Sequence, residues 1–313
     1  MTTPASNGAT PAKASLKSML KKGDLLIAPG IFDGISLRIA EQVGFKALYM
    51  TGFGTVGSHL GLPDAGLASY RDMVERVRVF SALSSVPVVC DADTGFGGLL
   101  NVEHTVKGYE AAGAAAIQLE DQEFPKKCGH TPGRKVIPIE QAVAKIQVAV
   151  KARSSPDFLI IARTDARTML GLDEALRRGR AFADAGADII FVESPESEEE
   201  MARIGATLGD MPLLVNAVEG GKTPVLSKER YIELGYQMAI YPATGFLAMG
   251  KALEGVYTEL KQTGTSTGCL KDTADFKGFC KTMGFEHVWD FDKAHADIEE
   301  EVTERILKKQ RVA

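Results

Sequence analysis

Short apolar runs alternate with longer amphipathic segments along most of this chain. Each apolar run is rich in β-branched and aliphatic residues and has, at or near its end, a residue able to do chemistry or bind a ligand, whereas the segments between the runs carry apolar residues at helical spacing. The unit occurs eight times, so we expect eight strands with helices between them. The predicted strands are 25–30, 47–52, 86–93, 115–121, 158–165, 189–194, 212–218 and 238–243.

A glycine closes several of the predicted helices just before the next strand. The segments 40–49, 111–118, 183–191 and 232–241 read AEQVGFKALY, AAGAAAIQ, ADAGADIIF and IELGYQMAIY. Glycine readily adopts the left-handed conformation that ends a helix, and a buried strand then follows within a few residues. Nearly continuous apolar strands alternating with helices predict an α/β fold, with a parallel sheet closed into a (β/α)8 barrel of the TIM type.

The predicted barrel occupies residues 23–262 and ends on a helix at about 245–262. Residues 1–22 are rich in Ala, Ser, Thr and Pro and predict a flexible N-terminal tail. Residues 263–313 predict a C-terminal helical extension, looser at 263–275 and charged from His295 onward. This extension carries more apolar side chains than a disordered tail, so we expect it to dock on a neighbouring subunit. These side chains are Phe276, Phe279, Phe285, Trp289 and Phe291.

Composition and charge narrow the class of protein. The 313 residues are 45% hydrophobic and 25% charged, as in a globular protein. The formal net charge of −5 argues against a nucleic-acid partner, because such a partner usually leaves a basic footprint. The four cysteines form no close-spaced disulfide framework and suit a reducing compartment; they are Cys90, Cys128, Cys269 and Cys280.

The sequence predicts a cytoplasmic protein with no membrane partner. It has no apolar run of about 18 residues that could span a bilayer, and its N-terminus lacks the apolar core of a signal peptide. The alternative concerns residues 1–22, which carry four lysines and no acidic residue. They could serve as a transit peptide for import into an organelle, although such peptides are usually rich in arginine.

Four carboxylates stand at or near the ends of the second to fourth predicted strands. Asp91 and Asp93 close the third strand on one face, Glu120 closes the fourth, and Asp64 lies in the loop after the second. In a barrel of this type these positions gather at the active-site end. Four carboxylates would repel each other unless a cation joined them, and hard oxygen ligands suit Mg²⁺, with Mn²⁺ as a substitute. Separate salt bridges to Arg and Lys are the alternative interpretation.

The loop after the fourth strand carries a cysteine among basic residues. Residues 120–130 read EDQEFPKKCGH. A thiol beside Lys126, Lys127 and His130 is expected to have a stabilised thiolate, which suits Cys128 as a nucleophile or as an acid–base group. The alternative is a cysteine that is merely exposed in a basic loop.

Three further polar residues end strands on the other side of the predicted barrel. Arg163 and Asn216 close the fifth and seventh strands and are suited to binding a carboxylate, while Glu193 on the sixth could hold the arginine. A purely structural network is the alternative. No strand ends on a lysine for Schiff-base chemistry, and no serine nucleophile elbow is present, so a metal-assisted reaction remains.

Five motifs in order along the chain resemble the isocitrate lyase / phosphoenolpyruvate mutase superfamily. They are YMTG at 49–52, LPD at 62–64, DADTGFG at 91–97, KKCGH at 126–130 and ARTD at 162–165. The resemblance runs from about residue 25 to residue 264. KKCGH is similar to the signature of the carbon–carbon lyase branch, whereas members that act on carbon–phosphorus bonds have a different loop there.

The resemblance implies a reverse Claisen (retro-aldol) cleavage of a 2-hydroxy acid by a homotetramer whose eighth helix is swapped between subunits. Mg²⁺ would be held directly by Asp91 and through water by Asp93, Asp64 and Glu120. The implied catalytic residues are Cys128, which protonates the carbanion, Tyr49, which takes or stabilises the hydroxyl proton, and Arg163 and His130. The implied substrate-binding residues are Thr51, Gly52 and Phe53 for the keto-acid carboxylate, and Gly129, Arg163, Glu193 and Asn216 for the other half.

Departures from the family pattern bear on the substrate. Methylisocitrate lyases place an arginine for a third carboxylate just after the eighth strand, and the counterpart here is Leu247. Phe53 and the loop at 216–224 (NAVEGGKTP) resemble the 2,3-dimethylmalate lyase and petal-death-protein branch, while oxaloacetate hydrolases carry a serine near Pro242. We therefore expect a 2,3-dimethylmalate-like dicarboxylate to be cleaved to pyruvate and a carboxylic acid. The alternatives are a 2-methylisocitrate lyase, an oxaloacetate hydrolase and a non-catalytic barrel that binds a keto acid.

Overall fold

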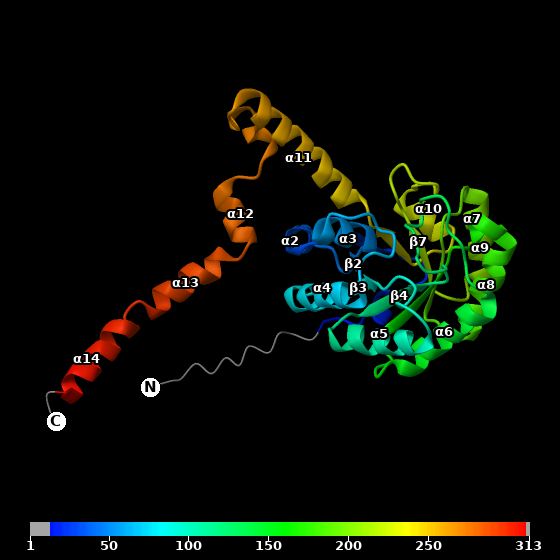
Figure 1. The fold of residues 1–313 in the computed structure, drawn as a ribbon, viewed down its shortest axis with the longest axis horizontal. Coiled ribbons are helices and arrows are strands. Elements are labelled where there is room, and N and C mark those ends of the chain that lie inside the picture. Colours follow the sequence, from blue (N-terminus) through cyan, green and yellow to red (C-terminus); the bar gives the residue numbers. More distant parts are fainter. Residues whose placement is uncertain (1–12, 311–313) are drawn as a thin grey trace. The chain divides into compact units, whose positions relative to one another are not determined.

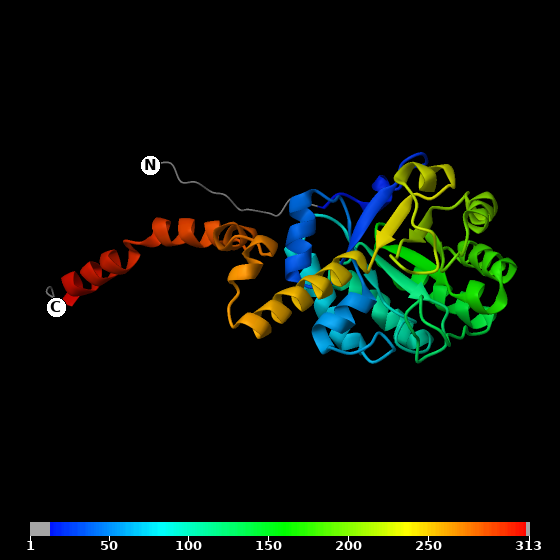
Figure 2. The ribbon, with the colours of Figure 1, turned by 90° about the horizontal axis from the view of Figure 1, so that it is seen from above.

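Eight parallel strands form a closed barrel in chain order in the computed structural model, which describes residues 13–310 (Figures 1 and 2). The eighth strand pairs with the first, so the sheet has no free edge. The predicted (β/α)8 barrel is confirmed, with seven strands inside their expected ranges and β1 ending one residue beyond its own. The strands are β1 (Leu26–Ile31), β2 (Leu48–Met50), β3 (Val88–Asp91), β4 (Ala116–Glu120), β5 (Leu159–Thr164), β6 (Ile189–Val192), β7 (Leu213–Asn216) and β8 (Met238–Tyr241).

Helices follow the strands and cover the outside of the sheet (Figure 1). Local signals set several of their ends. The side chains of Asp33 and Ser69 accept hydrogen bonds from backbone N–H groups in the first turns of α2 and α4, and Gly44 ends α2 in the left-handed conformation. The helices of the barrel are α2 (Gly34–Val43), α3 (Gly52–Leu60), α4 (Tyr70–Leu83), α5 (Leu99–Ala111), α6 (Ile139–Ala152), α7 (Ala166–Leu170), α8 (Leu172–Asp184), α9 (Glu198–Leu208), α10 (Lys228–Glu233) and α11 (Thr244–Thr263).

The strands divide their side chains between two apolar clusters. Successive residues of a strand point to opposite faces, so Leu48 and Met50 join the cluster under the helices, whereas Tyr49 joins the cluster inside the barrel. The inner cluster fills the barrel below the ends of the strands. The functional side chains therefore lie above a packed floor at the carboxyl ends of the strands.

The N-terminal segment differs from the flexible tail expected for residues 1–22. Its described part begins at residue 13 and includes a short helix, α1 (Leu16–Met19). Leu16 is 1% exposed and belongs to the inner barrel cluster, and burial of such a side chain contributes about 1.5–3 kcal/mol. Lys13 donates to the Ser81 carbonyl and Ser15 to Asp157. Residues 1–12 of the predicted tail lie outside the described residues.

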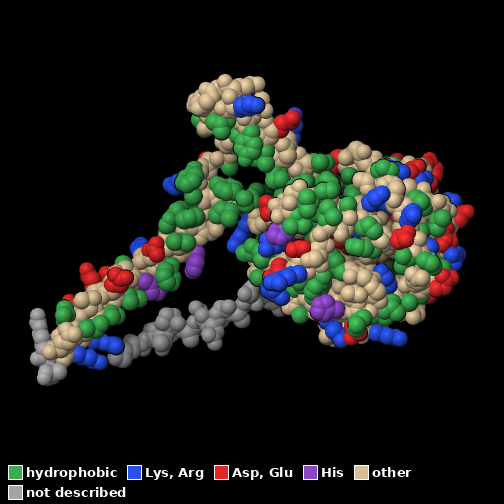
Figure 3. Space-filling model, viewed as in Figure 1, with side chains coloured by type: hydrophobic (Ala, Val, Ile, Leu, Met, Phe, Trp, Pro, Cys, Tyr) green, Lys and Arg blue, Asp and Glu red, His purple; other side chains and the backbone are tan. Residues whose placement is uncertain are grey.

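The chain separates into two compact units, Met1–Lys251 and Ala252–Ala313, and the division falls within α11. The sequence placed its own boundary after residue 262, at the end of the same helix. The second unit continues with η1 (Thr267–Asp272) in the segment expected to be looser, then α12 (Phe276–Thr282), α13 (Phe285–His295) and α14 (Ile298–Gln310). The helices α12 and α13 were not predicted individually. Hydrophobic side chains lie along these helices in Figure 3, and none of the residues of α12, α13 and α14 is buried.

No helix within residues 13–310 combines the length and the apolar character that crossing a bilayer requires.

Candidate active site

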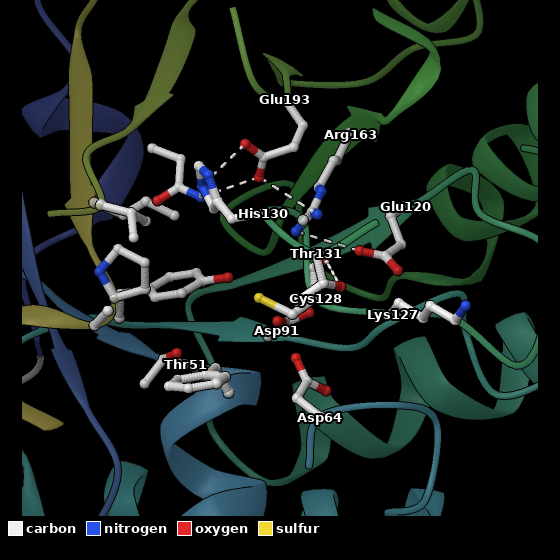
Figure 4. A pocket seen from close by; sticks show the side chains of 18 of the residues that line it. Thr51, Asp64, Asp91, Glu120, Lys127, Cys128, His130, Thr131, Arg163 and Glu193 are labelled. Atoms are coloured by element: carbon white, nitrogen blue, oxygen red, sulfur yellow. Dashed lines mark hydrogen bonds and ion pairs between the residues drawn. The ribbon is translucent and has the colours of Figure 1, made fainter. Parts of the chain in front are cut away.

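A cavity of about 230 Å³ lies at the carboxyl ends of the strands and contains most of the predicted site residues. Figure 4 shows Asp64, Asp91 and Glu120 around one part of it and His130, Arg163 and Glu193 around another, with Cys128 between them in this view. The predicted site residues that line the cavity are Tyr49, Thr51, Phe53, Asp64, Asp91, Glu120, Cys128, Gly129, His130, Arg163, Glu193 and Asn216. Gly52 and Asp93 do not line it, but both lie against residues that do.

A buried lysine lies among the carboxylates on the acidic side of the cavity, a position that the sequence analysis did not predict. Lys126, the first lysine of KKCGH, forms ion pairs with Asp64 and with Asp93, the latter at 2.6 Å. All three side chains are buried. Burial raises the pKa of Asp93 to about 7 although the Lys126 ammonium acts to lower it. Part of the alternative interpretation, in which the carboxylates are held by salt bridges, is therefore present in the structure.

The carboxylates outnumber the cations that hold them. Glu120 lies 3.3 Å from Arg163, which also forms ion pairs with Asp165 and Glu193. The Glu120 Oε1 atom is buried with no hydrogen-bond partner among residues 13–310. Burial raises the Glu120 pKa well above its usual range. No three His, Cys, Asp or Glu side chains within this described part are already arranged as a metal site. The donor set nevertheless fits a hard divalent cation, because it consists of buried carboxylates that lack sufficient counter-charge.

The Asp91 carboxylate reaches the cavity because the neighbouring helix begins with glycine. A Cβ on Gly52 would lie 2.6 Å from Asp91 Oδ2, so a larger residue would displace the carboxylate. Gly52 is the first residue of α3, and its N-cap, Thr51, makes no side-chain capping bond. The first backbone N–H groups of a helix have no partner within the helix and suit an anion. Thr51, Gly52 and Phe53, which were predicted to bind a carboxylate, lie at this helix N-terminus, and Thr51 and Phe53 line the cavity.

Two other segments of the chain hold the loop that carries Cys128, and the Cys128 side chain is partly buried. Its backbone N–H donates to the Asp64 carbonyl at 3.2 Å, and the Ser194 hydroxyl donates to the carbonyl of Gly129 at 3.1 Å. Burial raises the pKa of the Cys128 thiol, against the opposing effect of the backbone N–H of His130. The stabilised thiolate expected from the sequence is therefore wrong.

The physical reason is the direction of the two lysines. Lys126 points to the carboxylates, and Lys127 donates to the Gly133 carbonyl at 3.2 Å, so desolvation outweighs the positive charges near the sulfur. A protonated thiol at neutral pH is suited to donating a proton rather than to acting as a nucleophile.

Arg163 is the centre of the polar network on the other side. It donates to both oxygens of Asp165, at 2.9 and 3.0 Å, and its Nη2 lies 3.3 Å from Glu193 Oε2. Asn216 donates to the same Glu193 oxygen at 3.0 Å. Asn216 and Arg163 thus both meet Glu193, and each also lines the cavity. This network can orient groups for a bound carboxylate while it also fixes the top of the barrel.

His130 completes this network in its neutral form. Burial lowers its pKa, although the Glu193 carboxylate acts to raise it. The backbone N–H of Lys222 donates to Nδ1 at 3.3 Å, and Nε2 lies 3.2 Å from Asn216 Nδ2 and 3.5 Å from Glu193 Oε1. The imidazole is therefore a neutral hydrogen-bonding group at pH 7.

The Tyr49 hydroxyl donates a hydrogen bond to Gln118 Oε1 at 3.1 Å on the inner face of the barrel. Burial raises its pKa well above the usual value, and the nearby Asp91 carboxylate acts in the same direction. Of the two roles left open for Tyr49, stabilising the hydroxyl oxygen fits this environment better than removing its proton.

Several polar partners escaped the sequence analysis. Asp165 and Arg134 are both buried, and they form an ion pair that links the cysteine loop to the arginine strand. Gln118 and Lys126 also have no part in the predicted site. The only available signals were the position of Lys126 inside KKCGH and that of Asp165 at the end of a strand.

An apolar wall closes the part of the cavity near the eighth strand. It is formed by Phe53, Val218, Ile240, Pro242 and Leu247. The Phe53 ring packs edge-on against Phe246, with centroids 5.6 Å apart. These side chains can contact an alkyl group of a substrate, and none of them carries a positive charge.

The chain is similar over most of its length to curated enzymes. The phosphoenolpyruvate phosphomutase family model matches residues 16–261. The chain is 46% identical over 283 residues to the 2,3-dimethylmalate lyase of Eubacterium barkeri, covering 90% of this chain and 98% of that protein. It is 40% identical over 293 residues to the 2-methylisocitrate lyase of Aeropyrum pernix, covering 94% and 93%.

Solved structures give the same grouping. Oxaloacetate acetylhydrolase in complex with 3,3-difluorooxalacetate superposes with a TM-score of 0.85 at 34% identity, covering 90% of this chain and 96% of that chain. The trigonal crystal form of 2,3-dimethylmalate lyase gives a TM-score of 0.84 at 35% identity, covering 89% and 93%. Phosphonopyruvate hydrolase in complex with oxalate and Mg²⁺ gives 0.80 at 30% identity, covering 89% and 97%.

Proposed function

The chain belongs to the phosphoenolpyruvate mutase / isocitrate lyase superfamily, and from this premise we propose that it is a Mg²⁺-dependent carbon–carbon lyase acting on a 2,3-dimethylmalate-like acid. The observation that carries the proposal is the position of the Cys128 side chain between the carboxylates Asp64, Asp91 and Glu120 and the Arg163–Glu193 pair, in surroundings that raise the pKa of its thiol. The reaction breaks the bond between C2 and C3 of the substrate. It releases pyruvate and a carboxylic acid.

The acidic side would bind the half of the substrate that becomes pyruvate. Asp91, assisted by Asp93, Asp64 and Glu120, would hold the metal ion there. Bound Mg²⁺ supplies positive charge that stabilises the oxygen anion developing at C2. The N-terminus of α3 at Thr51–Phe53 would receive the adjoining carboxylate.

The chain's own side chains then handle the protons. The proton of the C2 hydroxyl would pass to one of the carboxylates that line the acidic side, Asp64, Asp91 or Glu120, while the Tyr49 hydroxyl would hydrogen-bond the C2 oxygen. Cleavage leaves an electron pair on C3, next to the second carboxylate, and Cys128 would donate its proton to that carbon. Arg163, His130 and Asn216 would hold the second carboxylate, with Glu193 and Gly129 shaping that end.

The apolar wall supports a dicarboxylate with an alkyl substituent over a tricarboxylate. Leu247 is the counterpart of the arginine expected in methylisocitrate lyases, so the wall offers no cation at this position to a third carboxylate. 2-Methylisocitrate is the second candidate, since the chain is 40% identical to a lyase of that name. Lys127, which also lines the cavity, is the cation that could serve its third carboxylate.

The decisive experiment compares pyruvate release from equal concentrations of 2,3-dimethylmalate and 2-methylisocitrate. Each substrate is measured with Mg²⁺ and with EDTA. Faster Mg²⁺-dependent release from 2,3-dimethylmalate supports the proposal. Faster release from 2-methylisocitrate assigns the second function, and oxalate formed from oxaloacetate would assign a hydrolase. Binding of a keto acid without turnover of any of these acids would leave a non-catalytic barrel.

We also infer a homotetramer in which the eighth barrel helix is exchanged between subunits. α2 exposes Ile35, Ile39 and Val43 at a spacing of four residues, which makes an apolar stripe on one side of the helix. α11 has no buried residue and itself exposes apolar side chains along its length, including Leu253 and Tyr257. Sedimentation equilibrium of the purified protein tests this assembly, and a monomer would contradict it.

A cytoplasmic location is the setting that the proposed chemistry favours. Proton donation by Cys128 requires a reduced thiol, and a reducing compartment keeps it so. Microscopy of a C-terminal fluorescent fusion in the source cells would test this, and an organellar signal would support the transit-peptide alternative instead.

A further inference from the structure

Lys145 lies on α6 outside the barrel, yet its side chain turns toward the active-site strands. It follows Ala142 by three residues and precedes Ile146, and both of these are buried on the face of α6 that meets the sheet. Lys145 lines a small cavity of about 10 Å³, which is separate from the active-site cavity. Two residues, Glu120 and Arg163, line both cavities. Lys145 therefore faces Glu120 from behind the active site.

The same lysine holds the turn that follows β3. Its Nζ donates to the Thr94 carbonyl at 2.9 Å. Thr94 lies between Asp93, with a φ of 50°, and Gly95, and Phe96 has a φ of 58°. A non-glycine residue in this region costs about 1–3 kcal/mol and persists only when surrounding contacts hold it there. The hydrogen bond from Lys145 is one of those contacts, and it fixes the backbone next to Asp93.

Charge also links Lys145 to Glu120. The Lys145 and Glu120 side chains line the same small cavity, which they share with Asp121 and Arg163. Lys145 forms no ion pair with any residue between 13 and 310, so no surface carboxylate in that range competes for its ammonium group. A lysine that only covered apolar surface would direct its ammonium group to solvent.

We propose that Lys145 is a positioning residue of the active site: it holds the Asp93–Gly97 turn through the Thr94 carbonyl and places a positive charge behind Glu120, so that both carboxylates keep the orientation in which they bind the divalent cation. The inference rests on the proposed function, because it takes these carboxylates to be metal ligands. Partners of this kind, beyond the ligands themselves, typically change metal affinity by about 10- to 100-fold.

The test measures Mn²⁺ binding to the full-length protein without substrate, from the electron paramagnetic resonance signal of free Mn²⁺. Lys145→Met removes the charge and the donor with little change in length, Lys145→Arg keeps both, and Lys151→Met changes an exposed lysine of the same helix. We expect Lys145→Met to weaken Mn²⁺ binding about tenfold. Lys145→Arg should restore most of the affinity, and Lys151→Met should match the wild type.

The outcomes separate this inference from the proposed function. Wild-type Mn²⁺ affinity in a folded Lys145→Met protein overturns the positioning role and leaves the lyase proposal intact. A wild-type protein that binds no Mn²⁺ overturns the metal-dependent function and this inference with it. Circular dichroism reports folding, and if Lys145→Met is unfolded, Lys145→Gln is judged by the same criterion, since it keeps a donor for the Thr94 carbonyl but lacks the charge.

Discussion

Gly129 lies so close to Arg163 that a Cβ on the glycine would be 2.5 Å from Arg163 Nη2. It would also lie 2.7 Å from Glu193 Oε2. The loop that carries Cys128 can therefore reach its place only because the next residue has no side chain. This contact ties the position of the proton donor to the pair expected to bind the substrate carboxylate.

Gly129→Ala is expected to lower kcat/KM for 2,3-dimethylmalate by about 100-fold, because the methyl group would push the Cys128 loop away from its working position. The free energy of unfolding should fall by only about 1–3 kcal/mol, since the loop can shift to relieve the contact of the new methyl group with Arg163 and Glu193. Pyruvate release and urea denaturation measure the two effects. Gly34→Ala is the control, because its Cβ would meet nothing closer than Leu83 at 3.8 Å. Undiminished activity of Gly129→Ala would contradict the geometry.

Cys128→Ser is expected to lower kcat by about 10²- to 10⁴-fold, the usual contribution of a positioned acid–base group. A hydroxyl is a far weaker acid than a thiol, whereas the shape of the site changes little, so KM should change much less than kcat. Steady-state pyruvate release gives both constants. Cys280→Ser, in the second unit, is the matched control and should behave like the wild type. Full turnover by Cys128→Ser would exclude the proton-donor role.

Local sequence patterns predicted the barrel and most of the cavity lining because each depends on short-range periodicity. A strand such as β5 reads as a buried apolar run, and barrel topology then carries its last residues, including Arg163, to the active-site end. The partners of those residues could not be predicted in the same way. Lys126 meets Asp64 across 62 positions, and Arg134 meets Asp165 across 31, so packing of distant loops decides these contacts.

The same limit explains two details that local sequence did not indicate. The thiolate of Cys128 was inferred from neighbours in sequence, but those lysines point elsewhere and burial dominates. The tail at residues 1–22 was inferred from composition, which does not indicate that Leu16, in its described part, is buried in the inner barrel cluster.

Arg178→Met is expected to lower the free energy of unfolding by about 3–5 kcal/mol. Arg178 is 3% exposed and donates to Asp121 at 2.9 Å, so its loss would leave a buried carboxylate without its cation. Arg177→Met is the control on the same helix. Its side chain is 59% exposed in a pair with Glu174, and its removal should cost at most about 1 kcal/mol. Urea denaturation of both variants measures the difference, and equal losses would refute this account of Asp121.

Removal of the divalent cation is expected to abolish pyruvate release, and added Mg²⁺ or Mn²⁺ should restore it. Asp91→Asn should lower the affinity for Mn²⁺ and the activity together, because it removes a charged oxygen from the acidic side of the cavity. Asp173→Asn, an exposed carboxylate on α8, should change neither. Activity that survives both EDTA treatment and Asp91→Asn would contradict the metal-dependent reaction.

Leu247→Arg is expected to shift the preference from 2,3-dimethylmalate toward 2-methylisocitrate by about tenfold or more in the ratio of their kcat/KM values. Leu247 lines the cavity and is 47% exposed, so a longer side chain has room there and can present its guanidinium to a third carboxylate. For the smaller substrate the same charge replaces apolar contact and should reduce kcat/KM. Leu247→Met is the control, because it alters shape without charge and should leave the ratio near that of the wild type. A ratio that Leu247→Arg does not move would place the determinant of substrate size elsewhere on the wall, at Pro242 or in the loop that carries Val218.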